Sequence, residues 1–206
     1  DLFIARRLIA IILVTTATAT TALAYTPVPL TEAQQQQLAS ATDRAAVDEG
    51  ALYPLLQNAS RWAEQPPHPD YLQLLSEPAM FRGDLFTIRG EFGHAREIKL
   101  ARPGPWGDRI TFWGVRVREG MVINGVKQPD FVVAILFADD GTTLVEPGKP
   151  GIPVTVVGRF YKIWRTVNSE GVGSNFLTFV ASPSSVVAVG NRALGTNVGS
   201  SAGQAP

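Results

Sequence analysis

The strongest pattern along the chain is an alternation of apolar and polar residues that begins near residue 82. An alternation with a period of two predicts strands with one buried face, and it occurs over residues 83–94 and 109–118. The continuous apolar run 131–137 predicts a strand that is buried on both faces. Two more strands are predicted over residues 154–164 and 175–181.

Five strands, several of them long, favour a small closed barrel with strong twist. We therefore predict a mainly β fold, a five-stranded OB-like Greek-key barrel over residues 81–181. Gly158, in the middle of the fourth strand, marks an expected bend or bulge. Residues 139–153 are too rich in Gly and Pro for the helix that usually joins the third and fourth strands of this fold, so we expect a loop there.

Before residue 81 the apolar residues recur at helical spacing. Thr31 with Gln34 forms a capping-box pattern, which predicts a helix over 31–49. Further helices are predicted over 48–62 and 71–75. Residues 25–80 are therefore expected to form a linker and a helical arm that precede the barrel.

The two ends of the chain differ from its middle. Arg6 and Arg7 precede a short apolar run that leads to Ala22-Leu23-Ala24, so residues 1–24 are predicted to be a signal peptide. The alternative is an uncleaved anchor, in which residues 8–23 would make the chain's only membrane contact. The protein is accordingly expected to be exported, either periplasmic or secreted, or else anchored. Residues 182–206 lack any period and are predicted to be a disordered tail, with a possible short strand at 186–189.

Composition removes several classes of chemistry. The chain has no cysteine and two histidines, His68 and His94, and no pattern of a nucleophile, a phosphate loop or paired carboxylates. We expect no catalytic residues, no metal and no cofactor, and therefore no enzyme. Lys+Arg and Asp+Glu both number 18, but residues 25–81 carry −5 and residues 82–165 carry +4. We expect the acidic arm to lie against the barrel; the alternative is a basic barrel face that receives an anionic ligand.

Aromatic and basic residues on the predicted strands are the candidates for ligand binding, because OB barrels bind through such side chains. The candidate site residues are Arg89, Trp113, Arg116, Arg118, Tyr161, Lys162 and Trp164. The competing interpretation is structural: the aromatics fill the core and the arginines form the wet face of a strand.

Two segments carry a resemblance. Phe81-Arg82-Gly83 opens the first strand, and Val154-Thr-Val-Val-Gly158-Arg-Phe160-Tyr161-Lys162 lies late in the domain. The combination resembles a group of uncharacterised exported bacterial proteins, which implies an OB-like barrel in a cell-envelope protein and no activity.

Together these observations predict a noncatalytic interaction module of the bacterial cell envelope, an adaptor or accessory subunit of a protein complex. The alternative is a periplasmic OB domain that binds a small ligand or a glycan through the aromatic and basic strand face. The expected partners are other envelope proteins, or else a small anionic ligand or glycan. The neutral net charge and the export signal argue against nucleic acid.

Overall fold

The computed structural model describes residues 29–57, 59, 66–104, 107–117, 122–123, 126–127, 131–138, 143–167, 171–190 and 192–193. The predicted signal peptide or anchor lies outside these residues, as do Arg118 and the tail beyond residue 193. Within the described ranges, no helix is both long enough and apolar enough to cross a membrane.

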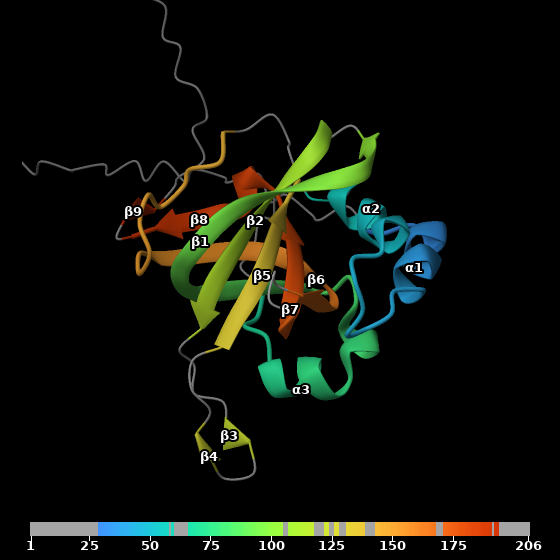
Figure 1. The fold of residues 1–206 in the computed structure, drawn as a ribbon, viewed down its shortest axis with the longest axis horizontal. Helices are drawn as coiled ribbons and strands as arrows, with labels where there is room; N and C mark the ends of the chain where they lie inside the picture. The colour runs from blue at the N-terminus through green and yellow to red at the C-terminus, as the bar shows by residue number, and fades with distance from the viewer. Residues whose placement is uncertain are drawn as a thin grey trace, which may run out of the picture.

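The fold is mainly β (Figure 1). Its long strands are β1 (Leu85–Gly104), β2 (Gly107–Val117), β5 (Phe131–Phe137), β6 (Pro153–Val167) and β7 (Gly173–Ala181). Short strands β3 (Val122–Ile123) and β4 (Val126–Lys127) pair with each other, and β8 (Val186–Val189) and β9 (Arg192–Ala193) extend the main sheet.

The main sheet has the order β1-β2-β5-β7-β6-β8-β9, and β1 also pairs with β6. The five long strands therefore hydrogen-bond in a closed ring. β5 and β7 pair in parallel, whereas the other neighbours in the ring are antiparallel. β8 and β9 continue outward from β6, so the sheet is a ring with an extension.

The sheet separates two apolar clusters. The inner cluster fills the ring with alternate strand residues such as Trp113, Val133 and Phe179. The outer cluster lies on the other face of β2, β5, β6 and β7, where apolar residues of the arm cover it, among them Leu38 and Leu52. Since both faces of β5 meet a cluster, the prediction of a doubly buried strand is confirmed.

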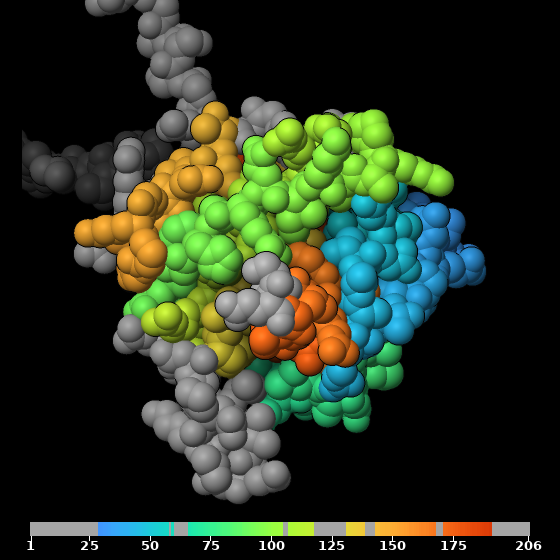
Figure 2. Space-filling view, viewed as in Figure 1, coloured from blue at the N-terminus to red at the C-terminus, as the bar shows by residue number. Residues whose placement is uncertain are grey.

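The arm lies against the ring of strands, as its opposite charge led us to expect. It contains α1 (Glu32–Ala39) and α2 (Glu49–Gln57), and in Figure 2 its blue surface lies directly beside the orange surface of β6 and β7. The predicted capping box of Thr31 and Gln34 is present. The predicted helix over 31–49 is too long, because α1 ends at Ala39 and the chain then runs along the edge of β6, with Ala45 bridging Trp164.

A third helix closes one end of the ring. α3 (Tyr71–Ser76) and the 3-10 turn η1 (Pro78–Phe81) come directly before β1. Tyr71 and Leu74 belong to the inner cluster, and the Tyr71 ring meets Phe131 edge-on at 4.8 Å. The inner cluster thus includes residues of a helix that comes before β1 in the sequence.

Three sequence predictions need correction. The first two long strands continue through most of the predicted loop 101–108 and form a projecting hairpin. The bulge in β6 lies between Phe160 and Lys162, whereas Gly158 marks a close approach: an added Cβ would come within 3.1 Å of the Val180 carbonyl oxygen. The predicted disordered tail begins with ordered residues, the 3-10 turn η2 (Pro183–Ser185) and then β8, which pairs with β6; the short strand predicted at 186–189 is confirmed.

Candidate binding surface

Four of the seven predicted site residues are buried and do not form a surface. Trp113 has no exposed area, and its ring meets Phe92 at 5.4 Å and Phe137 at 4.7 Å inside the ring of strands. Tyr161 and Lys162 are also fully buried, and Trp164 is 7% exposed beneath the arm. The predicted aromatic and basic face is therefore corrected: strand alternation sends Trp113 inward, and the arm covers the other three.

Tyr161 and Lys162 hold the arm instead. The Tyr161 hydroxyl donates to the Asp48 carbonyl at 2.6 Å and accepts from the Asp48 amide at 3.1 Å. The Lys162 ammonium donates to the carbonyls of Thr42 and Ala46 at 2.8 and 2.6 Å. Burial lowers the pKa of Lys162, against the opposing effect of Asp48 and Asp43, and raises the pKa of Tyr161. These bonds need a turn at 42–46, in which Arg44 has a φ of 55°, and this turn explains why the predicted long helix stops.

A buried ion pair completes this attachment. Arg82 is bonded to Asp43, and their side chains are 9% and 16% exposed. The other oxygen of Asp43 accepts from the Ile163 amide at 2.8 Å. We call the set Asp43, Asp48, Arg82, Tyr161 and Lys162 the seam.

The two segments that carry the family resemblance meet at the seam. Gly83, at φ +88°, donates its amide to the Phe160 carbonyl at 2.8 Å, and the Gly83 carbonyl accepts from Arg159 at 2.6 Å. Arg82 and Lys162, one from each segment, both bond to the arm. The two segments therefore both take part in attaching the arm to the ring of strands.

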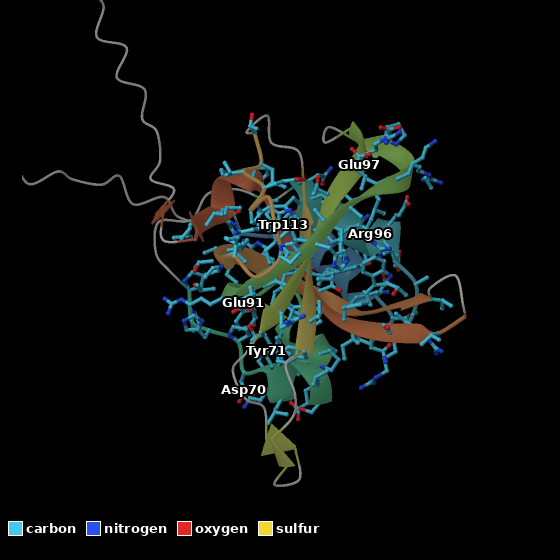
Figure 3. The ribbon with its side chains drawn as sticks, turned by 60° about the vertical axis from the view of Figure 1, so that its left-hand side comes forward. Asp70, Tyr71, Glu91, Arg96, Glu97 and Trp113 are labelled. Atoms are coloured by element: carbon cyan, nitrogen blue, oxygen red, sulfur yellow. The ribbon has the colours of Figure 1, made fainter. Side chains whose placement is uncertain are left out.

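Beside the arm, aromatic and basic side chains remain on the outer side of the sheet. We call them the outer strip: His94, Arg96, Phe112, Arg116, Trp164 and Phe176. The guanidinium of Arg96 lies 4.8 Å from the centre of the Phe112 ring and 5.8 Å from that of Trp164. Arg96 thereby joins β1, β2 and β6, and Figure 3 shows it between the β1–β2 and β6–β7 hairpins.

A groove of about 230 Å³ continues the outer strip along β1 and β2. Its walls include Glu91, His94, Arg116 and Val132, and Pro150 of the loop before β6. His94 lies over Gly114, where an added Cβ would come within 2.8 Å of the imidazole. The same imidazole lies 5.3 Å from the Phe112 ring, so the groove and the Arg96 platform are continuous.

The exposed charge on the outer strip is basic. Arg96 and Arg116 are exposed, and among the residues that the structure describes neither has a carboxylate at salt-bridge distance. The nearby Arg109 is instead bonded to Glu97. Two arginines of the prediction do not join the strip: Arg89 is exposed where β1 pairs with β6, and Arg118 lies outside the described residues.

Sequence reasoning missed His94, Arg96, Phe112 and Phe176. The alternation over 109–118 already placed Phe112 on the same face as Arg116, and that signal was sufficient to find it. Arg96 was missed because the first strand was expected to stop at His94. In the described part of the chain, no group of three or more His, Cys, Asp or Glu residues could hold a metal ion.

Comparisons with known proteins find similar solved structures but no family. No family model matches the chain, and no curated protein matches it. The structure of Plasmodium falciparum SSB in complex with ssDNA is similar at 13% identity, covering 47% of this chain and 85% of that one, with a TM-score of 0.29. This match contradicts the expectation that nucleic acid is not a partner, and we withdraw that expectation. At this TM-score the match assigns neither a fold nor a ligand to this chain.

Proposed function

We propose that the closed ring is an OB-like Greek-key barrel. Support comes from the strand order, since the first long strand pairs with the second and the fourth, and the third pairs in parallel with the fifth. The usual helix between the third and fourth strands is replaced by α3 at the end of the ring. OB barrels bind their ligands on the outer face of the second and third strands, between two hairpin loops, and the outer strip includes part of that face.

On this barrel we propose a noncatalytic interaction module of the bacterial cell envelope, which serves as an adaptor or accessory subunit of a protein complex. The arm is packed against the barrel, so the outer strip is the surface proposed to bind the partner. The observation that carries this proposal is the exposed guanidinium of Arg96, held over Phe112 and Trp164 between the two hairpins.

The chemistry of the strip favours an acidic segment of the partner. A guanidinium binds a carboxylate through two parallel hydrogen bonds, and stacking on aromatic rings fixes its orientation beforehand. Arg116 offers a second such group beyond His94, and the groove between them has room for side chains. An extended acidic peptide could therefore pair with both arginines at once.

A second candidate function is a periplasmic OB domain that binds a small anionic ligand or a glycan. The observation that favours it is the 230 Å³ groove with Arg116 and His94 in its wall. Such a ligand would occupy the groove alone, and its binding would depend on Arg116 rather than on Arg96.

The test is a titration of the purified chain with a fluorescein-labelled decapeptide of alternating Glu and Gly, followed by fluorescence anisotropy. Arg96→Ala should weaken binding about tenfold, because a charge-assisted bond contributes about 1.5 kcal/mol or more. Lys99→Ala is the matched control: it removes an exposed cation from the same strand, on the opposite face by alternation, and should leave the affinity unchanged.

Three outcomes would replace the proposal. Peptide binding that is insensitive to Arg96→Ala, or absent, would remove the outer strip as the docking surface. Tighter binding of a labelled oligothymidylate, lost in Arg96→Ala, would make single-stranded nucleic acid the partner instead. If the chain binds a small anion such as citrate, and Arg116→Ala but not Arg96→Ala abolishes that binding, the second candidate function is favoured.

A further inference from the structure

A second hollow lies on the other side of the arm from the outer strip. It measures about 540 Å³ and is lined by Gln37, Glu49, Gly50, Tyr53, Pro54, Gln57 and Arg102. The first six residues come from α1 and α2, and Arg102 comes from the β1–β2 hairpin, which reaches over these helices in Figure 2. Its volume lies within the range of small-molecule sites.

The floor of this hollow is fixed by hydrogen bonds between the arm and the hairpin. Glu49 accepts from the Ala101 amide at 2.7 Å and from the Tyr53 hydroxyl at 2.6 Å. The same hydroxyl lies 3.0 Å from the Arg102 carbonyl. The carboxylate and the phenol ring are therefore already positioned without a ligand, which lowers the entropic cost of binding.

The rim of the hollow carries exposed amides. Gln37 and Gln57 are both exposed, and each amide has two donors and an acceptor. The guanidinium of Arg102 adds further donors, and its charge balances that of Glu49. Tyr53, which is half-buried, contributes apolar ring surface between these polar groups, and Pro54 lies buried beneath.

We infer that this hollow, which we call the arm cleft, binds a neutral oligosaccharide. Sugar hydroxyls donate and accept together, as the two glutamine amides and the Glu49–Arg102 pair do, and the apolar face of a pyranose ring can lie on the Tyr53 ring. Opposite charges in the lining favour a ligand without net charge. The run Gln34–Gln37, otherwise a solvated helix face, thereby contributes Gln37 to a binding site.

The test is isothermal titration of the full chain with two probes, triacetylchitotriose and maltotriose. At least one of them should bind, and the double variant Gln37→Ala/Gln57→Ala should weaken that binding about tenfold. Gln36→Ala removes an exposed amide from the same run outside the arm cleft and should bind like the unaltered chain. Both probes share hydroxyls, and only the first carries acetamido groups, so the preferred probe identifies which groups the amides contact.

Folding of each variant is checked by its thermal unfolding midpoint. Should the double variant unfold, Arg102→Gln tests the same cleft from the hairpin and should also weaken binding. The inference is overturned if neither sugar binds, or if folded Gln37→Ala/Gln57→Ala binds as tightly as the unaltered chain. Arg96→Ala should leave sugar binding unchanged. Weaker sugar binding in Arg96→Ala would mean that the sugar binds at the outer strip and not in the arm cleft. The adaptor role is tested separately by the peptide titration.

Discussion

The seam and the outer strip lie on the same outer side of the ring of strands and each pairs a cation with aromatic residues, yet their cations differ in accessibility. In the seam, Tyr161 and Lys162 are fully buried and bond to backbone groups of the arm. In the outer strip, Arg96 stacks on aromatic rings and keeps its donors in solvent. A cation beside an aromatic residue thus holds the fold together in one place and remains available in the other.

This difference in accessibility depends on which part of the outer side of the sheet the arm covers. The arm and the sheet share the outer cluster, which includes buried residues of β1 and β2 as well as of β5, β6 and β7, whereas Arg96 of β1 and Arg116 of β2 stay exposed. Seam residues satisfy buried backbone carbonyls, so their removal should be costly. Arg96 and Arg116 of the outer strip contact solvent, so their removal should affect binding more than stability. The predictions below follow this order.

The largest effect is expected when the apolar contact of the arm is reduced. Leu52, fully buried in the outer cluster, contacts the barrel from α2. Leu52→Ala should lower the free energy of unfolding by about 3 kcal/mol, as loss of a buried leucine side chain leaves a cavity. Urea denaturation measures this change. Leu72→Ala on α3 is the control, since that leucine is 39% exposed and its truncation should cost less than about 1 kcal/mol. Equal costs would mean that the arm is not part of the folding unit.

A smaller effect with a pH signature is expected at the seam itself. Tyr161→Phe should lower the free energy of unfolding by about 1.5 kcal/mol near neutral pH, because the Asp48 carbonyl and amide both lose a partner. Burial raises the pKa of Tyr161 above the ordinary tyrosine value. Above about pH 10 the unfolded chain therefore loses a proton that the folded chain retains, so stability contributed by Tyr161 falls as pH rises.

The gap between the unaltered chain and Tyr161→Phe should narrow between about pH 8 and about pH 10.5, as urea denaturation at both values can measure. The lowered pKa of Lys162 acts in the opposite direction, but it acts in both proteins and so cancels in the difference. A gap that stays constant with pH would show that the Tyr161 hydroxyl is not buried as the structure has it.

The smallest effect on stability is expected in the outer strip. Arg96→Ala should change the free energy of unfolding by about 0.5 kcal/mol, the contribution of an exposed cation stacked on aromatic rings. Chemical denaturation of the same sample used for peptide binding provides the measurement. A loss of 2 kcal/mol or more would make Arg96 a structural residue and extend the seam across the strip.

Sequence pattern was sufficient for the strands because alternation reports directly which face is buried. It placed Trp113 and Phe112 on opposite faces, and the structure agrees. It did not reveal the seam, since the partners of Tyr161 and Lys162 are backbone groups more than 100 residues away. No local pattern distinguishes a lysine that will meet two carbonyls from one that will meet water. The seam and the outer strip could therefore be identified only from the tertiary contacts, whereas the β-rich architecture could be predicted from the sequence.

The position of the arm in the chain also sets an order of events during synthesis. Asp48 is made before its partner Tyr161 by 113 residues, and Tyr71 is made before the ring of strands that its side chain closes. The arm therefore lacks its packing partners on β6 and β7 until these strands have been made. Contacts this distant in sequence slow folding and leave apolar surface uncovered in the meantime. The apolar surface of the arm is thus exposed on the nascent chain until β6 and β7 have been made.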